Sequence, residues 1–248
     1  MYLTIKGLIL RVTNYNDHDA ILSVLTHSHG KLTVKARGLR KKNSPLIAPC
    51  QLLAYSEFVL FEYKGMYTIN EAHTVELFHG LRCDLQKLSL GSYFAQVSEV
   101  LSQEDQPNPE LLSLVLNSLF ALASLNAPEI LVKSVFELRC ASLAGYMPDM
   151  NGCIHCGNKM PDRFDVSTGH LECSSCRDQE SDGIRMPVSA GILDAMRYIC
   201  FCDPKQIFAF SVCEETLSAL SQISELYLTT QLERGFSALD FYKTILLN

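Results

Sequence analysis

Cys153-Ile-His-Cys156 and, sixteen residues later, Cys173-Ser-Ser-Cys176 form the most specific pattern in this sequence. Each Cys-x-x-Cys pair places two sulfurs on one tight turn, and the loop between the pairs can fold them together around a metal ion. Gly157 follows the first pair directly, and a glycine there lets the backbone curl and point N–H groups at the sulfurs. We therefore expect Cys153, Cys156, Cys173 and Cys176 to hold one structural Zn²⁺ per chain.

Two other uses of these cysteines must be weighed against zinc. A redox dithiol is typical of a thioredoxin-like strand and helix, a context that neither pair has. Disulfides do not fit a chain that we expect to stay in a reducing compartment. His155 or His170 could replace a thiolate, but His155 lies inside the first turn and its side chain should point away from the metal. Four thiolates leave no open position for water, so the metal would contribute folding free energy and no chemistry.

Helical periodicity precedes the cysteine loop. Apolar residues from Leu85 to Leu101 recur on one stripe, which predicts a first long helix. Asn108-Pro-Glu110 then provides an N-cap, a proline at the first helical position and an early acid, so the apolar run Leu111 to Leu125 should be a central helix. Pro128 opens a third helix, and Gly145 closes it just before the cysteines.

Helical periodicity also resumes after the loop. Ser189 is expected to begin one helix, and Ser211-Val-Cys-Glu214 forms a capping box before the apolar-periodic segment from Leu217 to Leu232. A loop of roughly twenty residues could not bury a core of its own without metal. We therefore predict a helical domain over residues 81–248, with a zinc-binding loop at residues 150–180 inserted in it.

Before these helices, the pattern is that of short strands separated by turns. Five segments alternate or run apolar in the manner of strands: Leu8–Val12, Ile21–Leu25, Leu32–Val34, Phe58–Phe61 and Met66–Ile69. Turn residues at His27-Ser-His-Gly30 and at Lys64-Gly65 indicate hairpins. Five antiparallel strands over residues 1–80 predict a closed barrel of the OB kind, because closure removes exposed edges. An SH3-like barrel is the alternative.

The residues between the third and fourth predicted strands are strongly basic. Five cations fall within eight residues: Lys35, Arg37, Arg40, Lys41 and Lys42. Gly38 and Pro45 mark an irregular segment, so we expect a mobile basic loop beside a barrel face, suited to backbone phosphates. A solvated surface loop is the alternative. Aromatic residues of the barrel could stack on bases or fill its core: Tyr15, Tyr55, Phe58, Phe61 and Tyr63.

Charge and composition limit the classes of protein to which this chain could belong. The 248 residues carry a formal charge of −6, and 48% of them are hydrophobic, which is enough for a sizeable core. Residues 1–80 hold nine Lys or Arg and six Asp or Glu, a net charge of +3 that leaves −9 for the remainder. Because exposed charges are screened beyond roughly 8 Å at physiological salt, the local basic patch matters more than the sum. Without a membrane-spanning run or a signal-peptide pattern, we expect a cytoplasmic protein.

Common catalytic motifs are missing from the sequence. It contains no G-x-x-x-x-G-K-[ST], G-x-G-x-x-G, H-E-x-x-H or G-x-S-x-G, so we expect no enzyme. Asp17-His18-Asp19 is the only compact acid and base cluster, and its place between two strands favours a polar turn over a catalytic site. The cysteines outside the two pairs are expected to act as small core hydrophobes: Cys50, Cys83, Cys140, Cys200, Cys202 and Cys213.

A basic barrel, a helical domain and an inserted four-cysteine loop, in that order, resemble the RecO family of bacterial DNA recombination and repair proteins. The stretches that carry the resemblance are Gly7-Leu-Ile-Leu-Arg11, Leu25-Thr26 with His29-Gly30-Lys31, Ala36-Arg37-Gly38 leading to Ser44-Pro45, and the four cysteines. The resemblance spans the full length. Some members of that family lack the thiols, which agrees with a structural metal.

The resemblance implies a non-enzymatic mediator that binds single- and double-stranded DNA and anneals complementary strands. It also implies help in loading RecA recombinase onto DNA coated with single-strand binding protein. The implied partners are RecR and the acidic C-terminal tail of single-strand binding protein, and the implied location is the cytoplasm, in association with the nucleoid. The five cations near residue 40 would neutralise phosphates on strands that otherwise repel each other. The acidic balance of residues 81–248 would confine DNA mainly to the barrel.

Two other hypotheses belong to different classes of function. The sequence pI of about 5.6 favours a protein-interaction scaffold that does not contact nucleic acid. The two Cys-x-x-Cys pairs could alternatively serve a thiol oxidoreductase. A gel shift at low salt separates the scaffold from the DNA-binding mediator, and the metal content of reduced protein tests the oxidoreductase.

Overall fold

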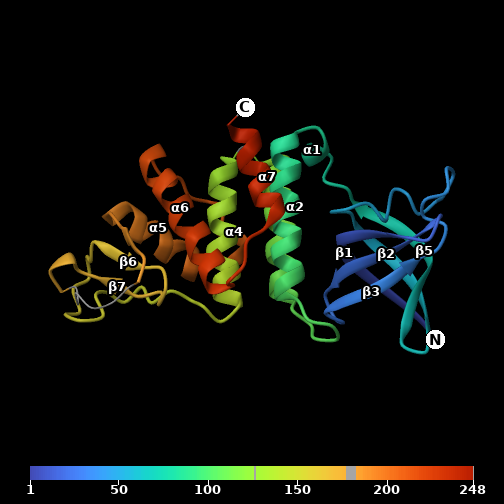
Figure 1. The fold of residues 1–248 in the computed structure, drawn as a ribbon, viewed down its shortest axis with the longest axis horizontal. Coiled ribbons are helices and arrows are strands. Elements are labelled where there is room, and N and C mark those ends of the chain that lie inside the picture. The colour runs from blue at the N-terminus through green and yellow to red at the C-terminus, as the bar shows by residue number, and fades with distance from the viewer. Residues whose placement is uncertain (126, 177–182, 248) are drawn as a thin grey trace. The chain divides into compact units, whose positions relative to one another are not determined.

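The computed structural model describes residues 1–125, 127–176 and 183–247, and they form two compact units (Figure 1). The first unit consists of Met1–Leu125 together with Phe236–Asn248, and the second of Asn126–Gly235. The change from strands to helices falls near residue 80, as the sequence predicts, but the first unit continues beyond it and includes the helices that follow the barrel.

The first unit begins with a closed barrel of five strands: β1 (Tyr2–Tyr15), β2 (Asp19–Thr26), β3 (Lys31–Ala36), β4 (Tyr55–Tyr63) and β5 (Met66–Glu76). β1 is long enough to pair with two neighbours, since Gly7 lies opposite Thr26 of β2 and Ser56 of β4. The strand order β1-β2-β3-β5-β4 closes through a short parallel pairing in which Lys35 lies opposite Thr68. This closed five-stranded barrel confirms the predicted OB type.

The barrel core is built from the inward-facing residues of all five strands. Ile9, Leu22, Val34, Phe58 and Ile69 each belong to this buried cluster. The connection from β3 to β4 adds three buried residues, Leu39, Leu46 and Cys50, which are 8%, 8% and 1% exposed. Because this connection contributes to the core, it is anchored to the barrel along its length.

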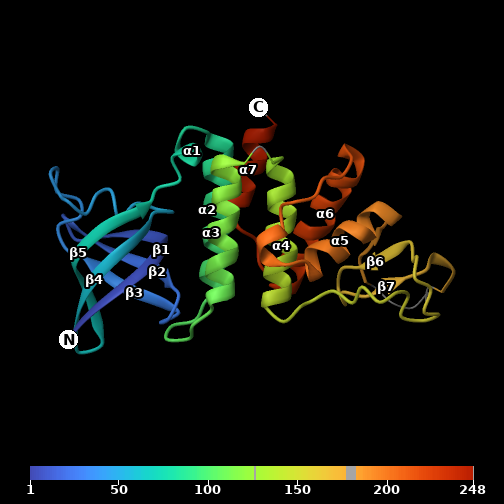
Figure 2. The same ribbon diagram turned by 180° about the vertical axis from the view of Figure 1, so that it is seen from behind.

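Four helices complete the first unit: α1 (His79–Arg82), α2 (Leu85–Leu101), α3 (Pro109–Ser124) and α7 (Ser237–Leu246). α2 packs against α3 and α7, and Figure 2 shows α3 beside α2. The side chain of Asn108 accepts a hydrogen bond from the N–H of Leu111, which confirms the predicted N-cap. The guanidinium of Arg11 lies 2.9 Å from a carboxylate oxygen of Glu99 and links β1 to α2.

The described residues of the second unit form three α-helices, two short 3₁₀ helices and a small sheet. Its elements are α4 (Glu129–Leu143), β6 (Arg163–Asp165), β7 (Leu171–Glu172), β8 (Arg185–Pro187), α5 (Ala190–Phe201) and α6 (Glu214–Gln231). α4 packs against α5 and α6. Ser189 caps α5 as predicted. The predicted capping box at Ser211–Glu214 is wrong, because the N-cap residue of α6 is Cys213, and the thiol of Cys213 donates to Thr216 Oγ1. No helix among the described residues combines the length and the apolar character that a membrane crossing requires.

A buried ionic cluster joins α4 to α6. The Lys133 side chain is 3% exposed, and its Nζ lies 3.0 Å from Glu137 Oε1 and 2.9 Å from Glu225 Oε2. The hydroxyl of Ser224 donates to Glu137 Oε2 at 2.7 Å. Since each buried charge has a partner of opposite sign, the cluster can hold the two helices in one register.

Candidate functional site

The structure brings the four predicted cysteines together in the second unit. Cys153 and Cys156 lie on a turn after α4, Cys173 follows β7, and Cys176 ends a short 3₁₀ helix, Ser174–Cys176. Their four Sγ atoms all lie within 4.8 Å of one another. The N–H of Ile154 donates to the carbonyl oxygen of Leu171, which places the first turn beside β7.

Backbone N–H groups surround the sulfur of Cys153. The N–H of Cys173 donates to it at 3.3 Å. Burial raises the pKa of the Cys153 thiol, but hydrogen bonds from the N–H groups of Cys156, His155 and Cys173 outweigh this and lower the pKa to about 6. Gly157 adopts a φ of +73°, and its own N–H closes the turn on the carbonyl oxygen of Cys153. The turn therefore favours a thiolate at neutral pH.

The distances between sulfurs fit a single tetrahedral metal ion. Cys156 Sγ lies 3.9 Å from Cys173 Sγ, and all the cysteines of the chain are free thiols. A Zn–S bond of about 2.3 Å implies roughly 3.8 Å between thiolates at the corners of a tetrahedron, whereas a disulfide needs about 2.05 Å. The side-chain amide of Asn158 donates to Cys173 Sγ at 3.2 Å and lowers the pKa of Cys173, but burial and the neighbouring sulfurs of Cys156 and Cys153 outweigh it and raise that pKa. The four residues form a group that could bind a metal ion.

The two histidines near this group do not join it. His155 is exposed, and its Nε2 lies 3.7 Å from Glu172 Oε1 rather than among the sulfurs. His170 is half-buried beside β7 and is likewise not part of the cysteine group. Of the remaining cysteines, Cys50 and the two in the helices of the second unit, Cys140 and Cys200, are buried as predicted. Cys202 is half-buried, and Cys83 and Cys213 are exposed, which contradicts their expected place in the core.

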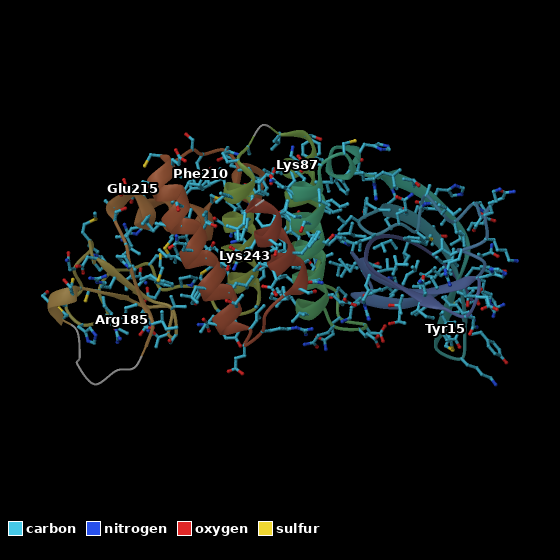
Figure 3. All side chains as sticks on the ribbon, turned by 45° about the horizontal axis from the view of Figure 1, so that its top comes forward. Tyr15, Lys87, Arg185, Phe210, Glu215 and Lys243 are labelled. Carbon is cyan, nitrogen blue, oxygen red and sulfur yellow. The ribbon has the colours of Figure 1, made fainter. Side chains whose placement is uncertain are left out.

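A second feature of this region is Arg185, whose side chain is 9% exposed and which the sequence did not single out (Figure 3). Arg185 on β8 lies 2.8 Å from Glu172 Oε2 and 3.8 Å from Asp165 Oδ2, so it ties the three short strands together. The hydrogen bond that Arg185 donates to the carboxylate of Glu172 raises the pKa of Arg185. A cavity of about 320 Å³ opens beside Cys173 and is lined by Arg163, Glu172, Cys173, Ser174, Gly183 and Arg185.

The predicted basic residues lie on the first unit, at one edge of the barrel. Lys35 belongs to β3, where its Nζ lies 3.2 Å from Asp19 Oδ2 and 4.8 Å from the ring centre of Tyr15, which Figure 3 labels. Arg40 is exposed, and its guanidinium donates to the carbonyl oxygens of Asn16 and Asp17, both at 3.3 Å. Arg37, Lys41 and Lys42 are also exposed, and within the described ranges none of the three has an ion pair within 4.0 Å.

The basic segment, residues 35–42, is anchored to the turn between β1 and β2 by hydrogen bonds. Asp19 Oδ1 accepts the N–H of Gly38 at 2.9 Å, and the N–H of Arg40 donates to the carbonyl oxygen of His18. The hydrogen bond from Gly38 and the pairing with Lys35 lower the pKa of Asp19. Asp19 thus serves the predicted polar turn, and it positions the cations.

The structure also separates the barrel aromatics into core and surface. Phe58 is buried and Tyr55 half-buried, so they contribute to packing. Tyr15, Phe61 and Tyr63 are 46%, 41% and 62% exposed. Tyr2 is 63% exposed and was not singled out, although the pattern Tyr2-Leu-Thr-Ile-Lys6 alternates as a strand does.

Fold and site together define a class of protein in which an OB-type barrel with a basic edge precedes a helical body carrying four clustered cysteines. Comparison with known families supplies the identification. The family model described as "Recombination protein O N terminal" matches residues 1–78, and "Recombination protein O C terminal" matches residues 82–240. The chain therefore belongs to the RecO family of DNA repair proteins, as its sequence pattern predicted.

Individual relatives agree with this family assignment over nearly the whole length. The chain is 34% identical over 247 residues to DNA repair protein RecO of Acetivibrio thermocellus, covering 98% of this chain and 97% of the relative. It is 30% identical over 245 residues to DNA repair protein RecO of Dehalococcoides mccartyi, covering 98% of this chain and 95% of the relative. It is 29% identical over 223 residues to DNA repair protein RecO of Bacillus subtilis, covering 90% of this chain and 86% of the relative.

Proposed function

We propose that this chain is a DNA-binding recombination mediator that anneals complementary strands and helps to load RecA onto DNA coated with single-strand binding protein. The observation that carries the proposal is the exposed basic segment on an OB-type barrel in a family of DNA repair proteins. Lys35, Arg37, Arg40, Lys41 and Lys42 are the proposed DNA-binding residues, and residues 1–80 the proposed DNA-binding domain.

The proposed mechanism is electrostatic and requires no catalysis. Arg37, Lys41 and Lys42 would neutralise phosphates on two strands that otherwise repel each other, so that the strands approach and pair. Lys35 already pairs with Asp19, so its contribution to binding should be smaller than that of the others. The helical domain of residues 81–248 would then be left for proteins, with RecR and the acidic C-terminal tail of single-strand binding protein as the proposed partners. Such a protein would act in the cytoplasm, at the nucleoid.

We further propose that Cys153, Cys156, Cys173 and Cys176 bind one Zn²⁺ in the loop of residues 150–180. Four thiolates at these distances suit zinc, and a site with four protein ligands stabilises a fold without activating water. The described residues of the loop form two short strands and one short 3₁₀ helix, so the metal would supply most of its stability.

Salt titration of single-stranded oligonucleotide binding tests the DNA contacts. Replacing Lys41→Ala and Lys42→Ala together should reduce the slope of log affinity against log salt by about 1.4, since each phosphate contact contributes about 0.7. The double variant Lys205→Ala and Arg234→Ala removes the same charge from exposed positions of the second unit and should leave the slope unchanged. Equal slopes for the two variants would overturn the proposed site.

Annealing of complementary oligonucleotides, with and without single-strand binding protein, tests the activity itself. The wild type should accelerate annealing of both bare and coated strands, and the Lys41 and Lys42 variant should accelerate it less. A protein that binds DNA but never changes the annealing rate would refute the mediator and leave only a DNA-binding protein.

A further inference from the structure

One end of the barrel exposes a group of large apolar side chains. Tyr2, Phe61, Tyr63 and Met66 are 63%, 41%, 62% and 61% exposed. They come from the start of β1 and from the hairpin that joins β4 to β5, which lie at the same end of the barrel (Figures 1 and 2). The rings of Tyr2 and Phe61 are 5.4 Å apart between centroids. Exposed apolar residues are normally scattered singly over a protein surface, so a cluster of exposed rings indicates a binding surface.

The strand register explains why these rings face outward. Phe58 and Leu60 of β4 point into the core and are 1% and 0% exposed, so the alternate residues Phe61 and Tyr63 point away from it. Tyr2 lies opposite Phe61 on β1, and Met66 lies opposite Tyr63 on β5. Paired residues share a face, so all four belong to the outer surface.

The same register connects the rings to the basic segment. Phe61 lies opposite Thr68 of β5, and Thr68 lies opposite Lys35 of β3. Because neighbouring strands are about 4.8 Å apart, only two strand spacings, roughly 10 Å, separate the backbone of Phe61 from that of Lys35. The basic segment and the rings therefore adjoin on one surface of the barrel.

The charges around the rings suit an anionic ligand. Lys64 at the hairpin turn places its Nζ 5.3 Å from the ring centre of Tyr63. Two acidic groups of the outer barrel surface are already paired, since Glu57 lies 4.0 Å from Lys6 and Asp19 lies 3.2 Å from Lys35. A ligand with flat apolar groups on an anionic backbone would match both the rings and the cations.

We propose that Tyr2, Phe61 and Tyr63 form a base-stacking platform for single-stranded nucleic acid. This proposal rests on the proposed DNA-binding function and adds the residues that select single strands. Every base has a flat apolar face, and that face is available in a single strand but covered by its neighbours in a duplex. The cations of residues 35–42 hold the phosphates, and the rings hold the bases.

The absence of tryptophan from the sequence allows a direct optical test. Tyr63→Trp introduces the only tryptophan of the chain, and stacking of a base on its ring should quench its fluorescence. An oligonucleotide of thymidines should quench this variant, whereas a duplex at the same phosphate concentration should not. Phe120→Trp is the control, because Phe120 is 51% exposed in the same unit but belongs to helix α3 and not to a barrel strand, and its fluorescence should not change.

Affinity measurements separate stacking from a general apolar contact. Tyr63→Phe should bind single strands as the wild type does, whereas Tyr63→Leu, which keeps an apolar side chain, should bind about 5- to 150-fold more weakly. The salt slope should stay the same in both, because no phosphate contact is removed. Because Tyr63 is exposed, neither replacement should unfold the protein, and the melting temperatures of the two variants check this.

The possible results distinguish the platform from the function on which it rests. Salt-dependent binding without quenching at Tyr63→Trp would overturn the platform and leave the proposed DNA binding intact. Equal quenching by duplex and single strand, or equal affinities of Tyr63→Leu and the wild type, would also overturn it. Failure of the wild type to bind any oligonucleotide would instead refute the proposed function.

Discussion

Cys156 is the most exposed of the four clustered thiols, so its replacement should disturb the metal group with little effect on packing. Cys156→Ser removes one of four ligands and should reduce the bound metal from one ion per chain to a small fraction of that. The measurement is zinc content of the purified protein by elemental analysis. Cys83→Ser, an exposed thiol of the first unit, is the control and should keep its metal. Full zinc content in Cys156→Ser would mean that another side chain completes the site.

Gly7 lies where β1 passes between β2 and β4. A Cβ at this position would lie 2.4 Å from Val24 Cγ1 and 3.0 Å from the carbonyl oxygen of Leu25. Val24 is buried and cannot move freely, so Gly7→Ala should lower the free energy of unfolding by about 1–3 kcal/mol. Gly235→Ala has open space around its added Cβ and should melt as the wild type does. Thermal melting of both variants measures the difference in stability. An unchanged melting temperature for Gly7→Ala would contradict the tight packing around Gly7.

At the scale of single residues, sequence reasoning identified chemistry that local spacing determines. The four cysteines were found because each pair lies within one turn. The contribution of Asp19 was missed, since Gly38, whose N–H it accepts, lies 19 residues away and approaches only through the pairing of β2 with β3. The exposure of Phe61 and Tyr63 depends on which face of β4 points inward, and that is settled only when the barrel closes.

At the scale of elements, the carboxylate of Asp19 couples the β1–β2 turn to the basic segment. Its pKa is lowered below the usual 3.8, chiefly by the N–H of Gly38 and by Lys35, so the carboxylate stabilises the fold when it is ionised. This stabilisation is present at neutral pH and is lost as the pH falls below about 3.8 through the lowered folded-state pKa. The stability difference between wild type and Asp19→Asn should therefore be constant above that pH and shrink below it. Melting temperatures over that range provide the measurement, and a pH-independent difference would contradict the assignment.

The ionic cluster between α4 and α6 makes a second prediction for elements. Lys133→Met leaves Glu137, which is fully buried, without its cation and should lower the free energy of unfolding by about 3–5 kcal/mol. Burial already raises the pKa of Glu137, and loss of Lys133 should raise it further. The variant should therefore recover stability as the pH falls and Glu137 becomes protonated.

The double variant Lys133→Met and Glu137→Leu is the control for this cluster. It removes both members of the most buried pair, so it should be less destabilised than Lys133→Met alone. Denaturant unfolding of the single and double variants measures the difference. A double variant that is less stable than the single one would show that the carboxylate of Glu137 is held mainly by Ser224.

Elements with strong local signals were predicted well, and short ones were not. The N-caps Asn108 and Ser189 confirm the starts of α3 and α5. α6 begins after Cys213 instead of Ser211, because the chain remains extended until that residue. The strands β6, β7 and β8 contain three, two and three residues, too few to show an alternation in the sequence. The ion pairs of Arg185 with Glu172 and Asp165 join residues that local spacing does not connect.

At the scale of the whole molecule, the two units should respond differently to loss of metal. All proposed DNA contacts lie in the first unit, and the four cysteines lie in the second. Chelation should therefore lower the melting temperature of the protein but leave its affinity for a fluorescent oligonucleotide within about twofold, since a structural metal supplies folding free energy to its own loop. Anisotropy before and after chelation, followed by zinc addition, measures this. A large and reversible loss of affinity would mean that the second unit takes part in DNA binding.

The barrel itself could be predicted as five strands, but its type could not be derived with the same certainty. The choice between an OB and an SH3-like barrel depends on β3 and β5, which meet through only two residue pairs. Those pairs join residues far apart in the sequence, and no local sequence pattern predicts them. The structure groups α2, α3 and α7 with the barrel in the first unit, and no local sequence pattern indicates that grouping.

The return of the chain to its first unit has a consequence for biosynthesis. Phe236 packs edge-on against Tyr93 of α2 at 5.5 Å, and this contact can form only after every residue of the second unit has left the ribosome. The cysteine-bearing unit can thus mature while the earlier half still lacks its last helix. A nascent polypeptide interrupted before that point would lack the cover that Phe236 gives to Tyr93, so its apolar α2 face would be open to chaperones and proteases.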